Sequence, residues 1–173
     1  SKTIKLFFGN KIAIQKRPYI RVNCRHLTNT ATVPHTDVDF GHSPFGFNLW
    51  VPLFDVLGKS GIYVYSFLES KLIYNNFKFD KRLDEHINFI KKDKKILKKT
   101  NLEKFFFKPR FYEAIILSNR NVHGAENEKN FPPRISVNLH FQNAKVPYGE
   151  KGAEFFKFAY FDSNAKQYKI VNA

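Results

Sequence analysis

The sequence predicts a mostly β fold with one inserted helix, arranged as an antiparallel sandwich or barrel. Short apolar or alternating segments recur along almost the whole chain between turn residues, and only one Lys-rich segment has helical spacing instead. A length of 173 residues suits a domain with its own hydrophobic core, so we expect a single domain over residues 1–173.

The expected strands are short and are separated by turn residues. The first two, TIKLFF and KIAIQ, flank the turn signal Gly9-Asn10. In chain order, we expect strands at residues 3–8, 11–15, 19–25, 45–54, 61–67, 113–119, 134–141 and 153–161.

Three of these strands alternate between two kinds of side chain, so each has two different faces. In 134–141, four polar side chains backed by four apolar ones favour the lining of a polar pocket over a solvent-facing surface. The faces expected to line the pocket hold Tyr19 and Arg21 in 19–25, Asn48 and Trp50 in 45–54, and Arg134, Ser136, Asn138 and His140 in 134–141.

The helical spacing lies within a Lys-rich insert at residues 78–110. From residue 81 to residue 103, Leu83, Ile87, Ile90 and Leu97 recur near one face among many lysines. We expect an amphipathic helix here, inserted between two strands, with the lysines on its solvated face.

The net charge of +14 is compatible with a nucleic-acid, lipid or phosphorylated partner. However, Lys greatly outnumbers Arg, and Asn, Ile and Phe are frequent, which is typical of an AT-rich genome; we expect no nucleic-acid partner and no membrane. The single cysteine, Cys24, excludes an intramolecular disulfide, and no segment resembles a signal peptide or a spanning helix. We therefore expect a soluble cytoplasmic protein.

The stretch VPHTDVDFGH contains the first candidate metal ligands. On an extended segment His35 and Asp37 point to the same side, with Cα atoms roughly 7 Å apart, so both could reach one cation. The alternative is a turn-capping aspartate beside a surface histidine. His42 is a rival ligand, which we expect in the loop over the site, where it would contact substrate.

His123, in LSNRNVHG, is the candidate third ligand, because it follows an apolar strand and precedes a glycine. Two histidines and one carboxylate leave positions open on the metal, as in the facial triad of non-haem Fe(II) oxygenases. A structural zinc site would instead need more thiolates than one cysteine supplies.

Arg134 begins the strand with the polar face, and Ser136 follows two residues later. A guanidinium beside a hydroxyl is suited to binding the carboxylate of a small acid. The alternative is a salt bridge between Arg134 and an internal Asp or Glu.

Taken together, PHTDVDFGHSPFGFNLWVPL and VHGAENEKNFPPRISVNLHF resemble the phytanoyl-CoA dioxygenase-like group of Fe(II)/2-oxoglutarate oxygenases. The resemblance covers about residues 15–145 and rests on the order His-x-Asp, a Trp-containing strand, His-Gly and Arg. It is weaker for the carbohydrate-cluster branch that includes the streptomycin-biosynthesis StrG-like proteins. The resemblance implies a double-stranded β-helix, that is, a jelly-roll, cupin-like barrel.

The resemblance also implies roles for the residues. His35, Asp37 and His123 would bind Fe(II), and Arg134 with Ser136 would hold 2-oxoglutarate beside Asn48 and Trp50. Simple core packing is the alternative for Trp50. The residues expected to contact substrate are Tyr19, Arg21, His42, Asn138 and His140.

The implied reaction uses O2 and 2-oxoglutarate to hydroxylate, or otherwise oxidise, a C–H bond of a small polar substrate, such as a sugar or nucleotide-sugar. The rival enzyme class is a metal-binding cupin-like isomerase or epimerase that needs no 2-oxoglutarate. A nucleic-acid-binding module would explain the charge but not the His-Asp-His-Arg order.

Two features depart from the family pattern. GIYVYSFLES replaces the family's usual stretch after the Trp strand, so the substrate lid should differ. The first expected strands begin without the usual preceding helical region, so we expect either a minimal version or a chain that lacks that region.

Overall fold

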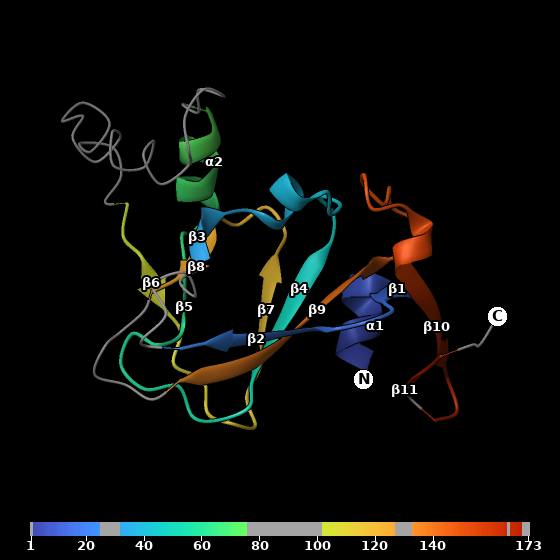
Figure 1. The fold of residues 1–173 in the computed structure, drawn as a ribbon. Helices are drawn as coiled ribbons and strands as arrows, with labels where there is room; N and C mark the ends of the chain where they lie inside the picture. The colour runs from blue at the N-terminus through green and yellow to red at the C-terminus, as the bar shows by residue number, and fades with distance from the viewer. Residues whose placement is uncertain (1, 25–31, 76–101, 127–132, 166, 171–173) are drawn as a thin grey trace.

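The structure is a computed structural model that describes residues 2–24, 32–75, 102–126, 133–165 and 167–170 (Figure 1). The helices are α1 (Lys2–Phe8), α2 (Phe67–Asn75) and the 3-10 helices η2 (Asp37–Phe40) and η3 (Ala153–Phe155). The strands are β1 (Lys11–Gln15), β2 (Tyr19–Asn23), β3 (Thr32–His35), β4 (Phe47–Pro52), β5 (Ile62–Val64), β6 (Phe105–Phe106), β7 (Ile115–Ser118), β8 (His123–Ala125), β9 (Arg134–Asn143), β10 (Phe156–Asp162) and β11 (Gln167–Ile170).

The strands form two antiparallel sheets. The larger sheet has the order β11-β10-β1-β9-β4-β7, with β2 also paired to β9, and the smaller sheet has the order β3-β8-β5-β6. β9 is the longest strand of the described chain, and it pairs with β4 along one edge and with β1 and β2 along the other (Figure 1). The mostly β, jelly-roll class predicted from the sequence is confirmed.

Apolar side chains from both sheets meet in one core cluster. Trp50 on β4 and Leu117 on β7 pack with Ile62 and Val64 on β5 and Ala125 on β8. The main favourable contribution to such packing is the burial of apolar surface, which stabilises by roughly 25 cal/mol per Å² removed from water. The cluster therefore fixes the smaller sheet against the larger one, next to the strands that carry the candidate ligands.

Along β4 and β9, buried and less buried side chains alternate as predicted from the sequence. On β4, Asn48 and Trp50 are each 1% exposed, whereas their apolar neighbours on the other face are only half-buried. On β9 the buried face is the polar one, with Arg134, Ser136 and Asn138 between 0 and 7% exposed. The interior of the two-sheet structure is thus lined by polar side chains from its longest strand.

The alternation of β2 is also present, but its apolar face is not buried. Ile20 is 69% and Val22 49% exposed on the outer side of the sheet. Period-two patterning separates the two faces of a strand, but it does not show which face another element covers.

The prediction of a strand at residues 3–8 is wrong, because this segment forms α1. A short apolar run fits either a helix or a strand, and the following residues decide between them. Gly9 adopts a positive φ of 77° and donates its N–H to the Lys5 carbonyl, which is a typical helix end. Phe8 then packs edge-on against Phe47 and Phe141.

Most of the predicted Lys-rich helix lies outside the described residues. The described end of the predicted 78–110 insert, from Leu102 to Arg110, is not helical and contains β6, which pairs with β5. Sequence patterns also did not reveal β3, β8, β11 or α2. Within the described ranges, no helix is long and apolar enough to cross a membrane.

Gly61 offers a test of the packing between β5 and β6. A Cβ at this position would lie 2.1 Å from the Phe107 carbonyl oxygen, and backbone cannot move aside as a side chain can. We predict that Gly61→Ala lowers the free energy of unfolding by about 1–3 kcal/mol through overpacking. Urea denaturation would measure this, with the exposed-site variant Ala114→Ser as control. An unchanged midpoint in Gly61→Ala would contradict the close approach.

Candidate metal centre

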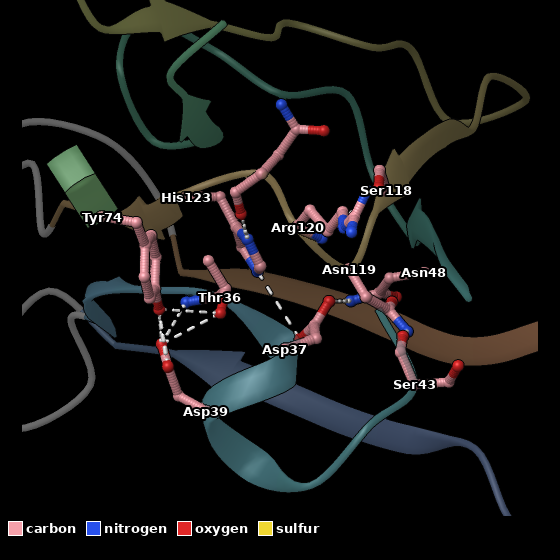
Figure 2. Close-up of polar contacts among 11 residues, drawn as sticks. Thr36, Asp37, Asp39, Ser43, Asn48, Tyr74, Ser118, Asn119, Arg120 and His123 are labelled. Carbon is pink, nitrogen blue, oxygen red and sulfur yellow. Dashed lines mark hydrogen bonds and ion pairs between the residues drawn. The ribbon is translucent and has the colours of Figure 1, made fainter. Parts of the chain in front are cut away.

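Three buried side chains converge where β3 and β8 meet the larger sheet. His35 lies directly opposite His123 in the β3–β8 pairing, and their ring centroids are 4.4 Å apart. Asp37 follows as the first residue of η2, and its Oδ1 lies 3.8 Å from His123 Nε2 (Figure 2). One ligand atom from each of the three lies within 4.8 Å of the others, and each residue is 6% exposed. The structure thus brings the predicted triad together.

The conformation of Thr36 determines which aspartate faces the histidines. Thr36 is extended, with φ −110° and ψ 158°, so the side chains of its neighbours His35 and Asp37 lie on one side. Asp39 accepts hydrogen bonds from the N–H and Oγ1 of Thr36, at 2.8 and 3.0 Å (Figure 2). The turn-capping aspartate is therefore Asp39, and Asp37 remains directed at His123.

His123 has a defined tautomer. Its Nδ1 lies 2.9 Å from the Asn121 carbonyl oxygen, which can only accept, so Nδ1 carries the hydrogen. The unprotonated Nε2 then faces Asp37. Such a backbone contact commonly orients a metal-binding imidazole. Burial lowers the pKa of His123, which keeps the ring neutral.

Asp37 is held in place by two hydrogen bonds from the protein. Its backbone N–H donates to the Asn119 carbonyl at 3.1 Å, and Asn48 Nδ2 donates to its Oδ2 at 3.3 Å. Burial raises the pKa of Asp37 to about 6, although His35 and the Asn48 hydrogen bond oppose this shift. A divalent cation would favour the ionised carboxylate and so compensate the cost of burial.

Arg134 lies in the same cavity as the triad. It is 7% exposed, its Nη1 donates to the Ser60 carbonyl, and its guanidinium lies over the Trp50 ring at 5.4 Å. Burial and the nearby Arg21 lower the pKa of Arg134 to about 10. No carboxylate of the described residues forms an ion pair with it, so the predicted alternative of an internal salt bridge is not found there.

Several polar atoms around Arg134 lack hydrogen-bond partners although they are buried. These are Arg134 Nε, Ser136 Oγ, Asn138 Oδ1 and Asn48 Oδ1. An unpaired buried polar group costs about 1–3 kcal/mol, so such groups are rarely left together without a ligand to bind. Arg134, Asn138 and Asn48 line the cavity, whereas Ser136 does not, so this end of the cavity offers unpaired polar atoms to a polar ligand.

The cavity between the triad and Arg134 has a free volume of about 20 Å³. That volume holds about one water molecule. Arg21, on β2, is the exposed member of the lining, so it is the lining side chain that borders solvent. The other predicted residues in the lining are Asn48, Trp50 and Asn138. Trp50 belongs both to the cavity and to the core cluster, so its two interpretations are compatible.

Three predicted substrate residues do not line this cavity. Tyr19 is 41% exposed on β2. His42 and His140 are buried at 4% and stack on one another, with ring centroids 3.6 Å apart and planes inclined by 20°. His42 is therefore neither part of the triad nor in an open loop over it, because Phe155 packs against its other side at 5.4 Å.

Sequence reasoning missed Asn119 and Asn121, whose main-chain carbonyls hold Asp37 and His123. A backbone acceptor leaves no side-chain signal in a sequence, so no pattern could have identified them.

No protein-family model and no curated protein matches this chain. Solved structures do match in fold. The first is described as the non-haem alpha-ketoglutarate-dependent epimerase SnoN from nogalamycin biosynthesis, with a TM-score of 0.52, 17% identity, and coverage of 92% of this chain and 53% of SnoN. SnoN in complex with Fe3+, alpha-ketoglutarate and nogalamycin RO gives a TM-score of 0.58 at 18% identity, covering 89% of this chain and 59% of that one.

A second enzyme, the non-haem monooxygenase ThoJ in a nickel complex, matches with a TM-score of 0.55 and 9% identity, covering 85% of this chain and 51% of ThoJ. The chain thus spans about half the length of these structures. At these identities the comparison establishes the fold, which is the jelly roll of these non-haem enzymes, two of whose structures are described as alpha-ketoglutarate-dependent or contain that acid.

The stacked histidines predict sensitivity of the fold to acid. Burial and the nearby Lys151 lower the pKa of His42 to about 4, and burial also lowers the pKa of His140. Below the unfolded value of about 6.5, the unfolded chain binds more protons than the folded one, so stability falls as pH decreases toward 4.

We therefore expect His42→Phe, which keeps the ring stacking, to lose less stability than the parent chain between pH 7 and pH 5. Urea denaturation of metal-free protein at both pH values would measure the difference. Equal losses in the two proteins would show that His42 does not cause the acid sensitivity.

Proposed function

We propose that this chain carries the catalytic centre of an Fe(II)- and 2-oxoglutarate-dependent dioxygenase that oxidises a C–H bond of a small polar substrate. The observation that carries the proposal is that a buried His-Asp-His triad and a buried arginine line the same cavity. The fold shared with SnoN and ThoJ supports it.

The donor set fits ferrous iron. His35, Asp37 and His123 offer two imidazoles and one carboxylate, which is the ligand set that non-haem Fe(II) oxygenases use, and further coordination positions remain open. The Asn121 carbonyl and the Asn48 amide would hold two of these ligands in their binding orientation. When bound with 2-oxoglutarate and O2, iron would supply the oxidising power for cleavage of the C–H bond.

The residues beside the triad fit a small dicarboxylic acid. Arg134 Nε and Ser136 Oγ are buried donors without partners, so together they could bind one carboxylate. The nearby Asn138 could contact the same molecule. Because the free volume is about 20 Å³, the acid would enter only if Arg21 moved away from the cavity.

The finer assignment rests on the motif order. We propose membership of the phytanoyl-CoA dioxygenase-like group, a carbohydrate-derived substrate, and a reducing cytoplasmic setting, for which the single cysteine is the support. Hydroxylation is the proposed outcome. Stereochemical inversion by the same centre is the second candidate, because the neighbour SnoN is an epimerase. A product that gains one oxygen atom would distinguish hydroxylation from inversion, which leaves the mass unchanged.

The metal ligands can be tested without a known substrate. Under anaerobic conditions, we predict that addition of Fe(II) and then 2-oxoglutarate produces a weak visible charge-transfer band. His123→Ala should abolish the band because it removes one of three donors, and the surface variant Arg110→Gln should retain it. Iron binding without any band would favour a metal-binding barrel that does not use 2-oxoglutarate. A full band in His123→Ala would refute the ligand assignment.

Arg134 should act on the acid and not on the metal. We predict that Arg134→Gln weakens 2-oxoglutarate binding by about tenfold or more, the loss expected for a hydrogen bond to a charged group. Fe(II) affinity should stay the same, since Arg134 is not a ligand. Anaerobic calorimetry would measure both affinities, again with Arg110→Gln as the matched control. Unchanged 2-oxoglutarate affinity would exclude Arg134 as its anchor.

A further inference from the structure

We propose that a groove behind the metal-ligand segment binds a small amphiphilic anion, that is, an apolar body carrying one carboxylate or phosphate. The groove lies between α2, the segment from Thr36 to Phe47, and the turn after β7. It is separate from the cavity of the proposed catalytic centre, so the proposal stands independently of that function.

Two adjoining cavities make up this groove. One has a volume of about 400 Å³ and includes Thr36, Lys71 and Tyr74, and the other has about 390 Å³ and extends to α1. Pro44, Phe67 and Arg120 line both cavities, which are therefore neighbours; we call the two together the Arg120 groove. Each part lies in the volume range of small-molecule sites.

The Arg120 groove and the cavity of the candidate metal centre have no lining residue in common. Two main-chain hydrogen bonds join the chain segments between them: Asp37 N–H donates to Asn119 and Tyr65 N–H donates to Val122, at 3.1 and 2.8 Å. Because no residue lines both spaces, a ligand in the groove would occupy a site of its own, apart from the candidate metal ligands.

Two cations, Lys71 on α2 and Arg120 after β7, line the groove. Within the part of the chain that the structure describes, no carboxylate forms an ion pair with Lys71 or Arg120. The acid on η2, Asp39, accepts hydrogen bonds from Thr36 and from the Tyr74 hydroxyl and forms an ion pair with neither cation (Figure 2). Burial and Asp39 raise the pKa of Tyr74, which keeps this hydroxyl a donor. The groove is therefore complementary to an anion.

The rest of the lining is mainly apolar, and three of its aromatic side chains are unusually open to solvent. Phe45 is 51%, Phe67 52% and Phe7 76% exposed, although large apolar side chains are normally buried. The Arg120 guanidinium lies over the Phe45 ring at 5.7 Å, so the cation borders the apolar surface directly. Apolar walls beside two cations match a ligand with an apolar body and one anionic end.

Calorimetry with decanoate and decyl phosphate, below micelle-forming concentrations, would test this proposal. Both anions should bind, whereas decanol and decyltrimethylammonium, which share the chain but not the negative charge, should bind at least about tenfold more weakly. Equal affinity for decanol and the two anions would overturn the proposal, because it would indicate non-specific apolar binding. Binding of only one anion would identify the preferred head group.

Variants locate the binding site. Arg120→Gln and Phe67→Ala should each weaken decanoate binding, whereas Arg110→Gln and Phe111→Ala, which replace the same residue types at exposed positions outside the groove, should not. Circular dichroism would verify that all four fold. Unchanged affinity in Arg120→Gln would overturn the proposal. His123→Ala should bind decanoate normally, so failure of the groove and failure of the metal centre give different results.

Discussion

Polar side chains buried in the interior carry a free-energy cost that the packing of the two sheets must offset. β9 presents Arg134, Ser136 and Asn138 to the interior, where each unpaired polar atom costs about 1–3 kcal/mol. The core cluster around Trp50 offsets this cost, because it packs the two sheets together immediately beside the polar row. Stability is thus concentrated in the apolar half of the interior, and the binding chemistry in the other half.

The candidate ligands are positioned by main-chain contacts more than by side chains. Antiparallel pairing places His35 opposite His123, and carbonyls of the β7–β8 turn hold the Asp37 N–H and the His123 ring. The capping of η2 by Asp39 keeps the neighbouring Asp37 directed inward. Such a triad is preorganised by the fold, so a metal would gain affinity without ordering new segments.

The segment at the start of η2 contributes side chains to two separate cavities. Its inner side carries Asp37, and its outer side carries Thr36, which forms part of the Arg120 groove. The similarity to SnoN and ThoJ extends to the fold, in chains about twice as long. Function in this chain must therefore be argued from these sites and not from the shared architecture.

Local patterns were enough to predict the candidate ligand types, the side on which His35 and Asp37 lie, and the two faces of β4 and β9, because period-two alternation is a local property of extended chain. Tertiary structure decided which faces are covered. Ile20 stays exposed because no described element packs on it, and His42 is buried because other residues pack on it. Residues 3–8 form a helix because Gly9 ends it with a positive φ and Phe8 packs against the sheet. Contacts between residues far apart in the chain leave no periodic trace in a single sequence.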